Sequence, residues 1–299
     1  MKILVVGGTG NVGGEVVKQL LSRNASVRIM TSSPDKVSKL SSDVEGVVGN
    51  VQDKDSLKAA MKNTDCVFFV TPFSEHEDRD GINVVEAAKA VGVRRIVYSS
   101  VHRLEDIPEA PHFAQKIPVE NAIKESGMAY TLLRPNNFYQ NDVWFKTPIM
   151  DYGIYPQPIG SKGIHRIDVR DIALAAANAL LKDEFTGKTF ALVGPDLMTG
   201  ESTAKVYGKY LGKEVVYAGD DLEKWSAQMK GMLPEWLVAD FVIMYRHFQT
   251  NGLIATPEHH AETERILGRK PISFDSFSEE IVARWKTESV AGVTAKSAS

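Results

Sequence analysis

Four closely spaced glycines near the start of the chain are the residues that most directly suggest chemistry, namely Gly7, Gly8, Gly10 and Gly13. An apolar run over 3–6 precedes them, and apolar residues at helical spacing follow over 12–21. Glycines permit a sharp turn and let a pyrophosphate approach the main chain, while the start of a helix offers free N–H groups. A strand, a glycine turn and a helix in this order therefore predict a dinucleotide site. The alternative is a glycine turn that only packs the helix closely against a sheet.

Further candidates follow the other expected strands, because ligands bind at the carboxyl ends of the strands in parallel α/β sheets. Around the glycine turn, we expect contacts to the pyrophosphate from Gly7, Thr9, Gly10, Asn11, Val12 and Gly13. Asn50 and Val51 are expected beside the adenine, together with Asp53. The candidates for the central phosphates and the nicotinamide ribose are Thr71, Pro72 and Phe73, and those for the nicotinamide are Pro135, Asn137 and Phe138. Each of these segments can also be a loop that caps a helix.

The end of the second expected strand bears on the choice of cofactor. Thr31, Ser32 and Ser33 stand there, and Lys36 follows closely. An NAD site usually has an acid at this point that binds the 2′-hydroxyl of the ribose. Hydroxyl groups and a lysine would instead accept a 2′-phosphate, so the sequence favours NADP (NADPH) over NAD. The nearby Asp35 and the lack of an arginine in this segment keep NAD open.

The segments that carry these residues alternate between strand and helix patterns in the first half of the chain. Strands are expected over 3–6, 26–31, 44–51, 65–70, 95–100 and 129–134, with a further strand over 188–193. Helices are expected over 12–21, 35–40, 55–61, 81–91 and 113–126. Repeated β-α units with right-handed crossovers predict an α/β fold with a Rossmann-type, doubly wound parallel sheet.

Beyond residue 135 the pattern becomes mostly helical. Helices are expected over 171–181, 201–211, 221–233, 235–248 and 256–267. We therefore expect an NAD(P)-binding Rossmann domain over 1–150, to which 160–195 contributes, and a smaller, mostly helical substrate-binding lobe over 151–286. A disordered tail is expected over 287–299.

Composition narrows the class of protein. A formal net charge of −3 argues against a nucleic-acid partner, and no apolar run approaches the roughly 18 residues that a membrane helix needs. The chain has one cysteine, Cys66, and enters its first strand without a signal peptide, so a cytoplasmic location is expected. His247, His259 and His260 lack the spacing of metal ligands, and no metal is expected. The expected partner is a small-molecule substrate, and a homodimer is left open.

Several motifs can be read together. They are the segments 7–13 (GGTGNVG), 49–53 (GNVQD), 97–100 (VYSS), 112–116 (HFAQK), 127–138 (GMAYTLLRPNNF) and 167–172 (IDVRDI). With these motifs the chain resembles the NmrA-like branch of the atypical short-chain dehydrogenases/reductases. That branch includes NAD(P)H quinone and dye reductases, isoflavone-reductase-like proteins and redox-sensing regulators. The resemblance implies a Rossmann fold that binds NADP.

The chain departs from the wider superfamily at one motif. Ordinary members use Tyr-x-x-x-Lys, in which the tyrosine transfers a proton and the lysine holds the ribose; here His112 and Lys116 stand at that spacing. Residues four apart share a helix face, so both are expected to point at the nicotinamide. The resemblance implies that Lys116 binds the nicotinamide ribose, and it leaves a part in proton transfer open. His112 is either an acid or an ordinary exposed histidine at a helix start.

These observations favour one function and leave two alternatives. The first hypothesis is an enzyme, an NAD(P)H-dependent reductase that passes a hydride to a small aromatic or quinoid acceptor, with Lys116 and His112 as its catalytic candidates. The second is a non-enzymatic sensor that binds NADP and reports redox state to a protein partner. The third is a sugar-nucleotide epimerase, which the missing tyrosine disfavours.

Overall fold

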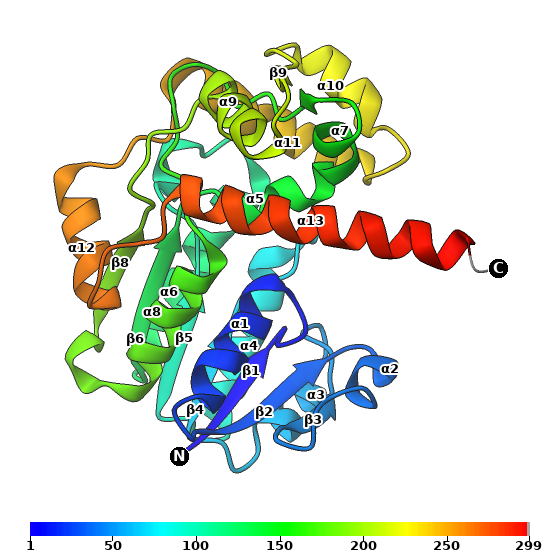
Figure 1. The fold of residues 1–299 in the computed structure, drawn as a ribbon. Coiled ribbons are helices and arrows are strands. Elements are labelled where there is room, and N and C mark those ends of the chain that lie inside the picture. Colours follow the sequence, from blue (N-terminus) through cyan, green and yellow to red (C-terminus); the bar gives the residue numbers. More distant parts are fainter. Residues whose placement is uncertain (298–299) are drawn as a thin grey trace. The chain divides into compact units, whose positions relative to one another are not determined.

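The computed structural model describes residues 1–297, and over 289–297 it describes the backbone alone. The chain divides into two compact units (Figure 1). The first unit consists of Met1–Asn136, Val169–Val193 and Pro257–Lys270. The second unit consists of Asn137–Asp168, Gly194–Thr256 and the chain from Pro271 onward.

A seven-stranded parallel sheet forms the centre of the first unit. Its strands are β1 (Lys2–Val6), β2 (Ser26–Thr31), β3 (Glu45–Val48), β4 (Cys66–Phe69), β5 (Arg95–Ser99), β6 (Ala129–Pro135) and β8 (Lys188–Leu192). They lie in the order β3-β2-β1-β4-β5-β6-β8. The strand order reverses between β1 and β4, which is the doubly wound arrangement that the alternating sequence predicts. The predicted Rossmann-type fold is thus confirmed.

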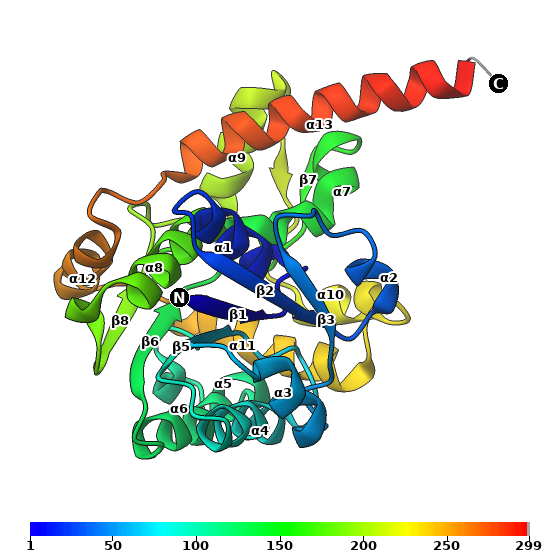
Figure 2. The same cartoon turned by 90° about the horizontal axis from the view of Figure 1, so that it is seen from below.

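Helices cover both faces of this sheet, as Figure 2 shows along the strands. One face carries α1 (Asn11–Leu21), α8 (Val169–Leu181) and α12 (Pro257–Leu267), and the other carries α3 (Lys54–Met61), α4 (Glu77–Ala90) and α6 (Lys116–Glu125). The short helices α2 (Pro34–Val37) and α5 (Pro111–Ala114) lie in connections, as do 3₁₀ turns at Leu104–Asp106 and Asp183–Phe185. Buried residues of alternate strand positions, such as Leu4 and Val6, pack with Leu57, Val84 and Val119 of the helices. Burial of this apolar surface is the main source of the fold's stability.

The second unit is mostly helical, as the sequence predicts. Its helices are α7 (Lys146–Met150), α9 (Gly200–Leu211), α10 (Leu222–Met229), α11 (Glu235–Asn251) and α13 (Phe274–Ser297), with a 3₁₀ helix at Tyr139–Phe145. Two short parallel strands, β7 (Ile154–Tyr155) and β9 (Val216–Tyr217), pair in a separate sheet. Among the described residues, no helix combines the length and the apolar character needed to cross a membrane.

The division of the chain differs from the expected one in its boundaries. The first unit ends at Asn136, before residue 150. It includes Val169–Val193, which lies within the segment 160–195 expected to contribute, and also Pro257–Lys270, which was not expected. These segments return because β8 pairs with β6 and because α12 packs on β8 and α8. Helix α13 is described as far as Ser297, and residues 298–299 lie outside the described residues, so the disordered tail expected over 287–299 stays a prediction.

Candidate functional site

The glycine turn joins β1 to α1 at the carboxyl edge of the sheet. Gly7 has a φ of +76°, a conformation that a side chain would strain. The N–H of Gly10 donates to the carbonyl of Gly7 at 2.9 Å, which closes the turn. A Cβ atom on Gly13 would lie only 2.3 Å from that carbonyl oxygen, so the helix can approach the turn only with glycine there. The predicted strand, turn and helix are therefore present.

The start of α1 is suited to an anion. Gly10 occupies the N-cap position, and among the described residues no side chain caps the helix. No acidic residue stands in the first turn, so the positive end of the helix dipole is not neutralised there. A Cβ atom on Gly10 would have only the Gly7 carbonyl within 4 Å, at 3.4 Å, so space is open beside this residue. These features fit a pyrophosphate held by main-chain N–H groups.

The hydroxyl groups at the end of β2 serve partly in local structure. Thr9 and Thr31 are joined through their hydroxyl groups at 3.5 Å, which ties the glycine turn to β2. Ser33 caps α2 by accepting the N–H of Lys36 at 3.4 Å, and its own N–H donates to Thr31. The side chains of Ser32 and Lys36 are exposed. Ser32 and Lys36 are thus the residues of this segment with the greatest freedom to contact a 2′-phosphate.

The segment after β3 folds on itself. The side-chain oxygen of Asn50 accepts the N–H of Gln52 at 3.0 Å. Asp53 caps α3 by accepting the N–H groups of Asp55 and Ser56, which is the alternative role considered for it. The carbonyl of Val51 accepts a hydrogen bond from Asn83 of α4. Contact of Asn50 and Val51 with an adenine stays a prediction.

Three strands end side by side at the same edge. Val6 of β1 pairs with Phe69 of β4, which in turn pairs with Tyr98 of β5. Gly7 consequently lies against Val70, the residue before Thr71. Thr71, Pro72 and Phe73 follow β4; Thr71 is buried, while Pro72 and Phe73 are exposed. The structure thus brings the glycine turn and the segment from Thr71 to Phe73 together.

A buried polar cluster surrounds Lys116 at this edge. Its ammonium group contacts the carboxylate of Glu77 and lies 3.3 Å from the hydroxyl of Thr71. Thr71 also donates to Glu77, and its oxygen lies 3.3 Å from the hydroxyl of Tyr98. Burial raises the pKa of Tyr98 to about 12, although the charge of Lys116 opposes this. At neutral pH the phenol therefore stays protonated.

Sequence reasoning missed Glu77 and Tyr98. Glu77 belongs to an acidic helix start that resembles a solvent-exposed one, yet its side chain is buried. Tyr98 lies within an apolar strand and stacks on Phe69, with ring centroids 4.5 Å apart. Tyr98 thus brings a tyrosine hydroxyl close to Lys116 although the chain has no Tyr-x-x-x-Lys motif. No local pattern could have indicated this pair, because it is formed across the sheet and a helix.

His112 and Lys116 do not lie on one continuous helix. The expected helix over 113–126 is divided into α5, which ends at Ala114, and α6, which begins at Lys116. The physical cause is Pro118, which cannot donate to the carbonyl of Ala114 and whose ring crowds it. His112 is buried, so its description as an exposed histidine is wrong. Its ring meets Phe73 edge-on, with centroids 5.6 Å apart.

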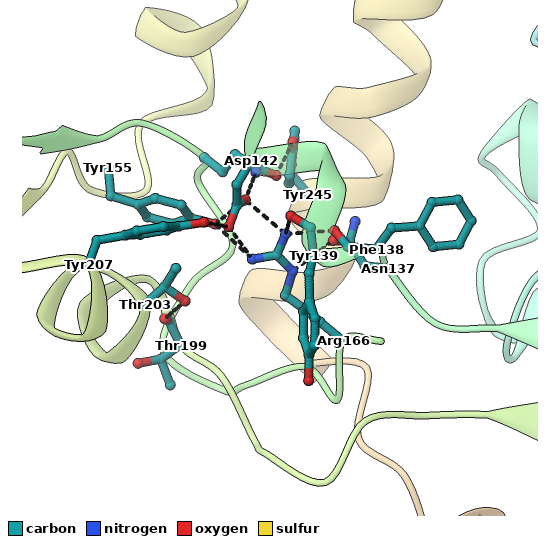
Figure 3. A network of polar contacts seen from close by, with 11 residues as sticks. Asn137, Phe138, Tyr139, Asp142, Tyr155, Arg166, Thr199, Thr203, Tyr207 and Tyr245 are labelled. Carbon is teal, nitrogen blue, oxygen red and sulfur yellow. Dashed lines mark hydrogen bonds and ion pairs between the residues drawn. The ribbon is translucent and has the colours of Figure 1, made fainter. Parts of the chain in front are cut away.

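The residues expected after β6 belong to both units. Pro135 ends β6 in the first unit, where its carbonyl accepts the N–H of His102. Asn137 and Phe138 belong to the second unit, where Arg166 holds both (Figure 3). Arg166 donates to the side-chain oxygen of Asn137 at 3.0 Å and to the carbonyl of Phe138 at 2.7 Å. The contact of Pro135, Asn137 and Phe138 with a nicotinamide stays a prediction.

Arg166 is also the centre of a buried network that the sequence analysis did not predict. Its guanidinium forms two hydrogen bonds to Asp142, at 2.8 and 2.9 Å, and both side chains are 0% exposed. Tyr207 donates to the same carboxylate at 2.8 Å and Tyr155 at 3.3 Å. Figure 3 shows these side chains converging on Asp142. Burial and the Asp142 carboxylate raise the pKa values of both tyrosines, so they remain donors at neutral pH.

Comparisons with known proteins agree with this fold. The model of the NmrA-like family matches residues 1–277. An NAD(P)H azoreductase of Xenophilus azovorans is 30% identical over 285 residues, which cover 93% of this chain and 96% of the relative. Quinone oxidoreductase 2 of Escherichia coli is 27% identical over 244 residues, which cover 79% of this chain and 84% of the relative.

Solved structures show the same architecture. Triphenylmethane reductase of Citrobacter sp., solved in complex with NADP(H), superposes with a TM-score of 0.82 at 22% identity and covers 94% of this chain and 100% of its own. The NADPH complex of the Escherichia coli quinone oxidoreductase also gives a TM-score of 0.82 at 22% identity, with coverage of 94% of this chain and 99% of its own. At this level of identity the likeness concerns the fold.

Proposed function

Because the chain belongs to the NmrA-like family, we propose that it is an NAD(P)H-dependent oxidoreductase that reduces a small aromatic or quinoid acceptor. Its relatives include proteins named azoreductase and quinone oxidoreductase. Two structures of the same fold were solved with NADPH or NADP(H), which supports NADPH as the cofactor. The sensor and epimerase alternatives are not favoured, since these relatives are reductases. A cytoplasmic location and a homodimer stay predictions.

One observation carries the proposal. The glycine turn lies at the same sheet edge as Thr71 and the buried ammonium group of Lys116, and no side chain of the described residues caps the start of α1. This edge, at the point where the strand order reverses, is where doubly wound sheets bind nucleotides. A cofactor whose pyrophosphate binds at α1 can extend its nicotinamide ribose along the edge toward Lys116.

The chain's own residues have distinct proposed roles. NADPH, when bound, supplies the hydride. The N–H groups at the start of α1 hold its pyrophosphate, and Ser32 and Lys36 hold its 2′-phosphate. Lys116 binds the nicotinamide ribose, and its positive charge stabilises the negative charge that a hydride leaves on the acceptor. The exposed ring of Phe73 offers an apolar surface to a flat acceptor, and His112 beside it is the candidate proton donor.

Turnover tests the proposed function. The purified protein is mixed with NADPH or with NADH and a panel of quinones, azo dyes, triphenylmethane dyes and aldehydes, and cofactor oxidation is followed by absorbance. We expect oxidation with quinones or dyes, faster with NADPH than with NADH. Tight NADPH binding without turnover on any acceptor would instead support the sensor.

Lys116→Ala is expected to weaken NADPH binding about tenfold, since a hydrogen bond to a charged group contributes roughly 1.5–3 kcal/mol. Binding of adenosine 2′,5′-bisphosphate, which lacks the nicotinamide half, should be unchanged. Calorimetric titration of both ligands measures the difference. Equal losses for the two ligands would contradict the assignment of Lys116 to the nicotinamide ribose.

Lys36→Met is expected to weaken NADPH binding about tenfold and to leave NADH binding unchanged, because only NADPH carries the 2′-phosphate. Lys39→Met is the matched control, since Lys39 is also an exposed lysine close to α2. Dissociation constants for both cofactors are measured for the three proteins. If Lys39→Met has the same effect as Lys36→Met, the preference arises from general charge and not from a contact.

A further inference from the structure

Glu77 and Lys116 form a charged pair inside the first unit. Glu77 is 1% exposed and Lys116 is 7% exposed, and such residues are almost never buried unless they are paired. One carboxylate oxygen, Oε1, receives both the Lys116 ammonium group and the Thr71 hydroxyl. The other, Oε2, has no hydrogen-bond partner among the described residues. Within the described residues, the hydrogen bonds of the Glu77 carboxylate are therefore confined to Lys116 and Thr71.

A close approach of two helices brings the pair together. Glu77 begins α4 and Lys116 begins α6. About one turn further along, Gly81 of α4 faces Val119 of α6, and a Cβ atom on Gly81 would lie 2.5 Å from a Val119 methyl group. The missing side chain lets the helices approach, so their first turns meet beside Thr71. The positive end of the α4 dipole also favours the Glu77 carboxylate.

We infer that Glu77 is a positioning residue that holds the Lys116 ammonium group as a fixed cation at the carboxyl edge of β4. Its part in the reaction rests on the proposed contact of Lys116 with the nicotinamide ribose. Without Glu77, the polar partners of the lysine side chain in the described part of the chain are the hydroxyl groups of Thr71 and Tyr98. The carboxylate thus supplies both the direction and the charge compensation that a buried lysine needs.

The electrostatics of the cluster agree with this role. Burial lowers the pKa of Lys116, but Tyr98 and Glu77 outweigh burial and raise it above its ordinary value of 10.5. Glu120 of α6, which is paired with Arg134 of β6, also acts on Tyr98 through its charge. Because the pKa is raised, the ammonium form predominates at neutral pH, and it is lost only as the pH rises above the ordinary range for lysine. Lys116 consequently acts as a cation and does not give up a proton near neutral pH.

A double-mutant cycle tests the inference through binding. Glu77→Gln is expected to weaken NADPH binding about tenfold and to leave adenosine 2′,5′-bisphosphate binding unchanged. In a Lys116→Met background the same substitution should have no effect, because Glu77 acts through Lys116. Asp80→Asn is the matched control, since Asp80 is a buried acid of the same helix that accepts a hydrogen bond from Ser74. Equal effects of Glu77→Gln with and without Lys116 would overturn the inference.

Chemical labelling gives a readout that does not depend on the cofactor. Lysines are methylated with formaldehyde and a borohydride reagent over a range of pH, and the peptide that contains Lys116 is followed by mass spectrometry. In the unsubstituted protein Lys116 should react only at high pH, whereas in Glu77→Gln it should react at least tenfold faster near pH 8. Unchanged reactivity would overturn the inference even if the protein proves to be a reductase.

The two failures remain distinguishable. If no acceptor is reduced, the proposed function fails, while the labelling result still decides the role of Glu77. If Glu77→Gln does not fold, Glu77→Asp retains the charge and withdraws it by one methylene group. Glu77→Asp is then expected to weaken NADPH binding by a smaller factor and to raise the labelling rate modestly, and an unchanged rate would count against the inference.

Discussion

Gly13→Val is expected to weaken the affinity for NADPH on the order of 100-fold or more. A Cβ atom at this position would lie 2.3 Å from the carbonyl oxygen of Gly7 and 2.9 Å from Cα of Gly8, both of which are backbone atoms. Since the backbone cannot rotate aside, α1 must move away from the turn, and its N–H groups leave the pyrophosphate site. Losing two charge-assisted hydrogen bonds of roughly 1.5 kcal/mol each accounts for about this factor. Calorimetric titration with NADPH measures the affinity.

Two neighbouring glycines provide the controls. A Cβ atom on Gly14 would meet only the Gly8 carbonyl, at 3.7 Å, so Gly14→Ala should bind NADPH normally. A Cβ atom on Gly10 would have only the Gly7 carbonyl within 4 Å, so Gly10→Ala should keep the turn while obstructing the cofactor. Thermal unfolding monitors the fold of all three variants. Normal NADPH binding by Gly13→Val would show that the pyrophosphate has been placed wrongly.

Arg166→Met is expected to destabilise the second unit by about 3–5 kcal/mol, because it leaves the buried Asp142 carboxylate without its main partner. Both side chains are 0% exposed, and the guanidinium also holds the carbonyl of Phe138. Tyr207 and Tyr155 still donate to the carboxylate, but neutral donors cannot replace the lost charge. The midpoint of urea-induced unfolding, followed by circular dichroism, measures the change.

A surface ion pair in the same unit supplies the comparison. Lys209 and Asp275 lie 2.7 Å apart and are exposed, so Lys209→Met should leave the urea midpoint almost unchanged. The double variant Arg166→Met/Asp142→Leu should recover part of the stability, because it removes both buried charges. If Arg166→Met costs no more than Lys209→Met, the network contributes little to the stability of this unit.

Local patterns were sufficient for much of the fold. The strand over 26–31 was predicted with its observed bounds, and the other sheet strands within a few residues, because continuous apolar runs mark buried parallel strands. The glycine turn was also predictable, because the residues of β1, of the turn and of α1 follow one another directly in the sequence. The predictions failed where the structure depends on features that a repeating pattern of apolar residues does not reveal. Pro118 divides the helix over 113–126, and the two-residue strands β7 and β9 are too short to show alternation.

The sequence by itself determined the doubly wound sheet and the glycine turn between β1 and α1. Each of these depends on residues that are neighbours along the chain. Only the tertiary structure decided that Glu77, Tyr98 and Thr71 surround Lys116, and that Arg166 meets Asp142. These partners are separated by tens of residues, so their contacts depend on how helices pack on the sheet and on one another. In the first unit that packing includes the close approach of α4 and α6 that Gly81 permits.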